Sequence, residues 1–97
     1  MFYHLAIFEQ AEGVYDYALR ESHRIFHSAK SAVDGAYRLA LTLPDSQYAR
    51  ISDNQGNWLL EAFLLESGRV LQRRPKGSPV EFSELSLLSS GLILYNT

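Results

Sequence analysis

Helical periodicity is clearest in residues 29–43, and this stretch constrains the fold more than any other feature of the chain. Ser28 precedes it with a hydroxyl that can cap the first turn, and Pro44 follows it and stops a helix because proline lacks an N–H. Apolar side chains recur at the three- and four-residue spacing that lines one face of a helix, at Ala29, Ala32, Val33, Ala36, Tyr37 and Ala40, with Leu39 and Leu43 at its border.

Two features bear on the bounds and packing of this helix. Ile25 and Phe26 continue the same apolar period backwards, so a start near Ser22 is an alternative to a start at residue 29. Gly35 lies in the middle, at a cost of about 1 kcal/mol relative to alanine. The many small side chains predict a helix that lies close against a sheet.

The rest of the chain favours strands and turns. The first two apolar runs can pair as a hairpin, and the Asn- and Gly-containing turn at 53–57 predicts a second hairpin. Residues 58–66 are rich in Leu, Ala and Glu, which prefer helix, but turn residues at both ends favour a strand. The predicted strands are residues 2–8, 14–20, 48–52, 58–66 and 69–73.

The last part of the chain follows a break at residues 75–79, Pro-Lys-Gly-Ser-Pro. Residues 81–90 are expected to form a short helix with Phe82, Leu85 and Leu88 on one face, before an apolar terminal segment at 91–95. The predicted architecture is α+β: an antiparallel sheet of about five strands packed on one main helix. Residues 1–97 are expected to form a single domain, because 97 residues support one core.

Composition narrows the classes of function. Nine Lys and Arg against eleven Asp and Glu give a formal charge of −2, unlike a protein that coats DNA or a strongly acidic DNA mimic. The lack of cysteine excludes disulfides, thiolate nucleophiles and cysteine-based metal sites. No apolar run is long enough to span a bilayer, and the first residues lack the basic region of a secretion signal. We expect a cytoplasmic protein without membrane contact.

No motif of the sequence indicates catalysis or a cofactor. No serine lies in a Gly-x-Ser-x-Gly or Ser-x-x-Lys arrangement, and the six glycines are too dispersed for a phosphate-binding or dinucleotide-binding loop. Carboxylate pairs such as Glu61 with Glu66 would need a cleft that a small domain seldom encloses. We therefore expect a protein that is not an enzyme.

Three histidines give the least favoured alternative, a small metal-binding regulator. His23 and His27 are four residues apart, which places two imidazoles on one helical face, and His4 is a candidate third ligand. The simpler interpretation is a pair of partly exposed histidines, so no metal is predicted.

A basic segment supports a second alternative, a nucleic-acid-associated protein. It holds four of the nine positive charges within eight residues, and Tyr48 or Trp58 could stack on single-stranded bases nearby. Charge on an edge strand, which prevents aggregation, is the simpler interpretation. The basic residues are Arg69, Arg73, Arg74 and Lys76.

Aromatic content supports the preferred hypothesis, a protein-binding module. Six Tyr, five Phe and one Trp exceed what one small core can bury, and Tyr and Trp are enriched at protein interfaces. A homodimer through the first hairpin or through the strand at 58–65 is one form of such binding. The predicted contact residues are Tyr3, Tyr15, Tyr17, Trp58, Phe63 and Leu65.

A resemblance covers residues 25–60. Ile25-Phe26-His27-Ser28, followed by Ala32, Ala36, Leu39-Ala40 and the stretch 49–59, resembles a pattern of small strand–helix–hairpin proteins of bacteria and phages, some anti-CRISPR inhibitors among them. The resemblance implies a fold and transfers no binding residues. It also implies a non-enzymatic phage or mobile-element inhibitor that occupies a surface of a larger complex, such as a CRISPR effector.

Overall fold

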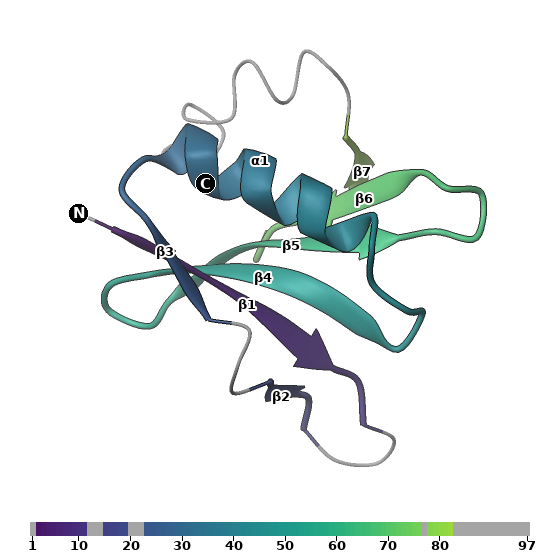
Figure 1. Ribbon diagram of the computed structural model, residues 1–97, viewed down its shortest axis with the longest axis horizontal. Coiled ribbons are helices and arrows are strands. Elements are labelled where there is room, and N and C mark those ends of the chain that lie inside the picture. Colours follow the sequence, from purple (N-terminus) through teal and green to yellow (C-terminus); the bar gives the residue numbers. More distant parts are fainter. Residues whose placement is uncertain (1, 12–14, 20–22, 77, 83–97) are drawn as a thin grey trace.

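One helix packs on an antiparallel sheet in the computed structural model, which describes residues 2–11, 15–19, 23–76 and 78–82 (Figure 1). The predicted α+β class is confirmed. The elements in chain order are β1 (Tyr3–Glu9), β2 (Tyr17–Ala18), β3 (Arg24–Phe26), α1 (Ala29–Ala40), β4 (Gln47–Asp53), β5 (Trp58–Leu64), β6 (Val70–Arg73) and β7 (Val80–Glu81).

The sheet has more strands than the five expected. Six lie in the order β2-β1-β4-β5-β6-β7, and β3 is a further strand that pairs with β1. β2 pairs with Phe8 and Glu9, whereas β3 pairs with residues 3–5, so these two short strands share one edge of β1. β3 and β4 flank β1 on opposite sides and both run antiparallel to it, so α1 crosses over β1 to join two mutually parallel strands.

The helix begins where the main prediction placed it. The Ser28 hydroxyl accepts a hydrogen bond from the Ser31 backbone N–H at 3.1 Å, as an N-cap does. The alternative start near Ser22 is wrong, because residues 24–26 form β3. The apolar period there reflects packing of Phe26 beside the helix rather than helical structure.

The helix ends at Ala40 rather than at residue 43. The Thr42 hydroxyl and backbone N–H both donate to the Leu39 carbonyl, at 2.8 and 3.0 Å, in a turn that closes the helix. Pro44 disfavours helical geometry at Leu43, so the chain leaves the helix before it and buries Leu43 instead.

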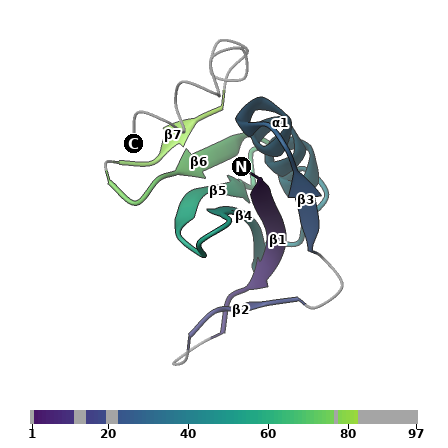
Figure 2. The same cartoon turned by 90° about the vertical axis from the view of Figure 1, so that its left-hand side faces the viewer.

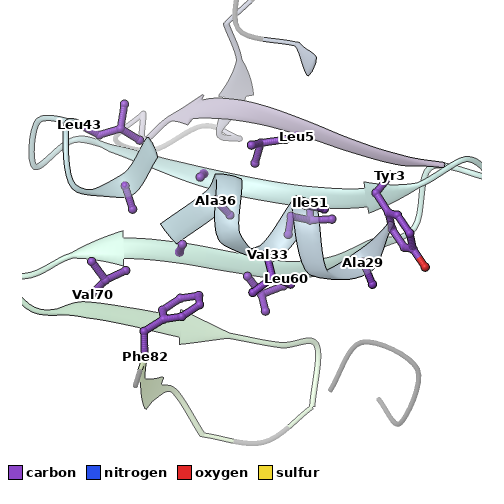
Figure 3. Close-up of a cluster of buried hydrophobic side chains, with 14 residues drawn as sticks. Tyr3, Leu5, Ala29, Val33, Ala36, Leu43, Ile51, Leu60, Val70 and Phe82 are labelled. Atoms are coloured by element: carbon purple, nitrogen blue, oxygen red, sulfur yellow. The ribbon is translucent and has the colours of Figure 1, made fainter. Parts of the chain in front are cut away.

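The core lies between α1 and one face of the sheet (Figure 3). Ala32, Ala36 and Ala40 are fully buried, and their small side chains let the helix approach β1, β4 and β5 closely. At Gly35 the helix also lies close to β3, because an added Cβ would lie 2.8 Å from Cζ of Phe26. The sheet contributes alternate side chains to this core, among them Leu5, Ile51, Leu60, Ala62 and Val70.

Two hairpins have the turn chemistry that the sequence predicts. Gly56 and Gly68 adopt φ values of +89° and +87°, which side chains rarely tolerate. In the first turn, the Asp53 carboxylate accepts hydrogen bonds from the backbone N–H groups of Asn57 and Gln55. The hydrogen bond from Asn57 is the largest of the effects that lower the pKa of Asp53. Between these turns, the strand predicted for residues 58–66 is confirmed as β5, which ends at Leu64.

The segment after β6 differs from the prediction at its start. Val80 and Glu81 form β7 and pair with β6, so Glu81 is not the first residue of a helix. Phe82 follows this strand and is 8% exposed, against the ring of Tyr37 at a centroid distance of 5.3 Å. The rest of the predicted helix at 81–90 and the terminal segment at 91–95 lie outside the described residues.

Candidate binding surface

The sheet face opposite α1 gathers aromatic and charged side chains. In Figure 2 the helix lies on one side of the curved sheet, and no helix or strand of the described residues crosses the other side. Register places two rows of side chains across this face: one aromatic row from β1 to β5 and one charged row from β4 to β6. We call it the open sheet face and define it by Phe8, Tyr48, Arg50, Trp58, Glu61, Phe63 and Arg73.

The charged row is an Arg–Glu–Arg triad. Register pairs Arg50 with Glu61 and Glu61 with Arg73 directly across neighbouring strands, where side chains interact strongly. Arg50 Nε lies 2.8 Å from Oε2 of Glu61, and Arg73 Nε lies 2.9 Å from Oε1. The Glu61 side chain is only 1% exposed, whereas those of Arg50 and Arg73 are 25% and 46% exposed. The two arginines therefore cover and neutralise a buried carboxylate.

The aromatic row supports both guanidinium groups. The rings of Phe8 and Tyr48 stack at a centroid distance of 5.7 Å, and Tyr48 contacts Phe63 at 4.9 Å. The guanidinium carbon of Arg50 lies 4.0 Å from the ring centroid of Phe8, and that of Arg73 lies 4.8 Å from Phe63. Both distances are within the range of cation–π attraction. Hydrogen bonds on one side and rings on the other thus restrict both arginines.

A β-bulge brings Trp58 onto the open sheet face. The register between β4 and β5 shifts after Ile51, so that Ile51 pairs with Leu60 but Ser52 pairs with Trp58. Leu59 is the additional residue, and it packs against the core. Strict alternation would have placed Trp58 on the same face as Leu60, but the bulge turns it to within 5.7 Å of the Arg50 guanidinium.

Tyr48 links the triad to the loop before β2. Its hydroxyl donates to the Asp16 carboxylate at 2.6 Å and accepts from Nη2 of Arg50 at 3.2 Å. Burial raises the pKa of Tyr48, and the hydrogen bond to Asp16 raises it further. The phenol therefore stays protonated and acts as a fixed hydrogen-bond donor.

A hollow of about 480 Å³ lies at one end of the open sheet face. It is lined by the cation of Arg73, the carboxylate of Asp16 and the aromatic ring of Phe63. Its lining residues are Gln10, Ala11, Asp16, Ser46, Tyr48, Phe63 and Arg73. The hollow and the triad share Arg73.

A second hollow, of about 590 Å³, lies between β3 and α1. Its charged side chains include Asp34 and Arg38, which neutralise each other across one helical turn at 2.9 Å and are largely exposed. An exposed pair of this kind contributes little energy and holds no side chain in a fixed geometry for a ligand.

The six predicted contact residues are dispersed. Trp58 and Phe63 lie on the open sheet face, and Leu65 follows β5 with 38% of its surface exposed. Tyr15 is 95% exposed before β2, and Tyr17 belongs to β2. The prediction that Tyr3 lies on a contact surface is wrong. Its side chain is 2% exposed, because β1 turns this position toward the helix.

The basic segment does not form one patch. Arg69 pairs with Glu81 at 3.6 Å, while Arg73 pairs with Glu61. Arg74 is half-buried and Lys76 is exposed. β6 is also not an edge strand in the described sheet, because β7 pairs with its outer side. Two of the four cations are thus already matched by carboxylates.

The histidines are arranged differently from the helical pair that their spacing indicated. Residues 24–26 between them form β3, so His23 and His27 do not share a helical face. The His23 ring instead lies beside His4, with centroids 5.0 Å apart. Within the described ranges, no group of three or more His, Cys, Asp or Glu side chains could hold a metal ion.

Sequence reasoning missed Phe8, Arg50 and the structural role of Glu61. One signal was present: Glu61 is the single charge within the apolar stretch 58–65, as expected for a buried carboxylate with a charged partner. The identity of that partner depends on strand register.

Comparison with known proteins yields no relative. No protein-family model, curated protein or solved structure matches this chain. Among the described residues, no helix has the length and apolar character needed to cross a membrane.

Proposed function

We propose that this chain is a non-enzymatic, cytoplasmic protein-binding module that acts through the open sheet face. The observation that carries the proposal is the set of half-exposed Trp58, Phe63 and Arg73 side chains around a buried carboxylate. Trp, Tyr and Arg dominate the residues whose truncation weakens protein complexes most. The face thus combines apolar area with fixed, charged hydrogen-bond donors.

A protein partner fits this face better than nucleic acid does. Binding to a phosphate backbone draws its affinity from cations whose counterions are released. Here Arg50 and Arg73 share the charge of Glu61, and Arg69 is paired with Glu81. Two of the four cations in the predicted nucleic-acid segment at 69–76 are therefore already matched by carboxylates.

The narrower proposal, an inhibitor from a phage or mobile element that occupies a surface of a larger complex such as a CRISPR effector, rests on the resemblance of residues 25–60 alone. A second copy of the chain is the alternative occupant of the open sheet face. It would be recognised by sedimentation of the pure protein at micromolar concentration.

The test is affinity capture from the native host with four forms of the protein. Wild type and Arg38→Ala, whose side chain is 76% exposed on α1, are expected to retain the same host protein. Trp58→Ala and Arg73→Ala are expected to retain it at least about tenfold less well, as removal of a dominant contact does. Circular dichroism of each variant checks that it is folded.

Two outcomes contradict the proposal. Either wild type retains nothing beyond blank resin and sediments as a monomer, or all four forms retain the same proteins equally. A mobility shift with single-stranded DNA and RNA at low salt checks the alternative. Retardation that Arg73→Ala abolishes would favour nucleic acid instead.

A further inference from the structure

The Arg–Glu–Arg triad is costly as a device for stability alone. A buried carboxylate loses its hydration, and the attraction of its partners only partly offsets that loss. Well-packed apolar side chains of similar volume generally stabilise a protein as well or better. The helix-side face of the same strands is built in that way, with Ile51, Leu60 and Ala62. We therefore look for the role of Glu61 in its effect on the two arginines.

Glu61 holds both guanidinium groups in place before any ligand arrives. An arginine normally loses considerable side-chain freedom when it binds, which weakens the complex. Here that freedom is already restricted, because Arg50 and Arg73 each donate hydrogen bonds to Glu61 and lie over an aromatic ring. Such an arginine can take a ligand at low entropic cost.

Both guanidinium groups keep donors for another acceptor. Their hydrogen bonds to Glu61 and Tyr48 use Nε and Nη2 only, so within the described part of the chain Nη1 of each arginine has no hydrogen-bond partner. Arg73 is the more accessible, since 46% of its side chain is exposed. Glu61 is buried beneath it, so the ligand must approach from the opposite edge of the guanidinium.

The triad has a net positive charge that attracts an anion. Two arginines and one glutamate carry a formal charge of +1. The hollow beside Arg73 has room for a side chain. Asp16 lies on the same hollow, and its charge disfavours a ligand with several negative charges, such as a phosphate chain. A single carboxylate satisfies both conditions.

We infer that the open sheet face recognises a carboxylate of its protein partner, an Asp or Glu side chain in a peptide segment that also carries apolar residues. The carboxylate pairs with Nη1 of Arg73, its side chain enters the hollow over Phe63, and neighbouring apolar residues contact the ring of Trp58. Glu61 and Tyr48 act as positioning residues for the arginines. This inference rests on the proposed function, because it names the partner chemistry of the same surface.

The chain contains a built-in reporter for the test. Trp58 is its single tryptophan and lies 5.7 Å from the Arg50 guanidinium, so its fluorescence reports binding at this face. The probes are three blocked tripeptides, acetyl-Leu-X-Leu-amide, in which X is Glu, Gln or phosphoserine. Each is titrated up to about 10 mM, a range that covers weak, millimolar binding.

We expect saturable binding of the Glu peptide and at least about tenfold weaker binding of the Gln peptide, which has the same shape without the charge. Added salt should weaken the binding of the Glu peptide. Arg73→Gln should reduce its affinity at least about tenfold, while Arg38→Gln, the exposed control on α1, should leave it unchanged.

Three results would overturn the inference: no binding of the Glu peptide, equal affinity for Glu and Gln, or tighter binding of the phosphoserine peptide, which would indicate a phosphate ligand. Failure here and failure of the proposed function are distinguishable. If capture depends on Arg73 while the peptides do not discriminate charge, the function stands and the carboxylate does not. If the peptides bind and discriminate charge but capture from the host fails, carboxylate recognition at this face stands and the proposed protein-binding function does not.

Discussion

The two faces of the sheet are buried by different means, and Leu60 and Glu61 show this within one strand. These neighbours on β5 are 0% and 1% exposed and point to opposite sides. Leu60 packs under α1 among apolar side chains, whereas Glu61 lies under two arginines that contact aromatic rings. The comparison indicates that the helix-side face stabilises the fold. On the open sheet face, burial of the Glu61 carboxylate costs some of that stability and holds two arginines in fixed positions.

The largest expected effect tests the helix-side face. Leu60→Ala should lower the free energy of unfolding by about 4 kcal/mol, because it removes buried methyl groups and leaves a cavity under α1. Leu65→Ala, just beyond the same strand and 38% exposed, should cost less than about 1 kcal/mol. Urea unfolding measures both. Similar losses for the two variants would contradict the assignment of the core to this face.

The next effect tests the open sheet face. Glu61→Gln should cost about 3 kcal/mol, the lower part of the range for breaking a buried ion pair, because Arg73 is half-exposed. Glu66→Gln, at an exposed position of the same segment, is the matched control and should be nearly neutral.

A triple variant separates charge from volume at this face. Arg50→Met, Glu61→Leu and Arg73→Met together should restore stability to within about 1 kcal/mol of wild type or better, since an apolar triad removes the desolvation cost. The same variant should lose the binding that the arginines provide. If it unfolds as easily as Glu61→Gln alone, the triad itself contributes to stability, and the contrast between the two faces disappears.

A smaller effect on stability is expected at Tyr48, and this effect depends on pH. Tyr48→Phe removes the hydrogen bond to Asp16 and should cost about 1 kcal/mol at neutral pH. Burial raises the pKa of Tyr48 in the folded state, so folding favours the neutral phenol. Wild type should therefore keep this stability below about pH 10, the ordinary tyrosine pKa, and lose it as the pH rises toward the folded-state value.

Ultraviolet titration of the phenols checks this directly. Wild type should show a tyrosine that ionises later than the others, and Tyr48→Phe should lack that late step and have a flatter alkaline stability profile. Tyr15→Phe, at a 95% exposed position, is the control and should leave stability at neutral pH unchanged. A late step that persists in Tyr48→Phe would assign the raised pKa to another tyrosine.

The smallest effect tests how closely α1 packs. Gly35→Ala gains about 1 kcal/mol of helix propensity, but its Cβ would lie 2.8 Å from the Phe26 ring. We expect a net loss of up to about 1 kcal/mol in wild type and a gain of similar size in a Phe26→Leu background. Thermal unfolding of the four proteins gives the coupling. Equal effects in both backgrounds would show that the ring moves aside freely.

Local signals predicted much of the fold. The Ser28 cap, the alanine stripe and the glycine turns act within a few residues, and the helix start and both hairpins follow from them. The strand character of residues 58–64 required the turns on both sides, because the local preference of Leu, Ala and Glu is for helix.

Local signals of this kind predicted little of the candidate site. Trp58 was a predicted contact residue, yet strict alternation puts it on the helix side, and a single bulged residue turns it to the open sheet face. Tyr3 was expected at the surface, but its strand position turns it into the core. Arg50 carried no signal, because an arginine in an amphipathic strand is usually solvated.

The sequence by itself determined the class of the fold, the start of the helix at its Ser28 cap, and the places where the two hairpins turn, since these depend on neighbouring residues. Only the tertiary structure decided that Arg50 and Arg73 meet over Glu61. That meeting depends on the register of three strands, and a shift of one residue in any of them would send its side chains to the opposite face.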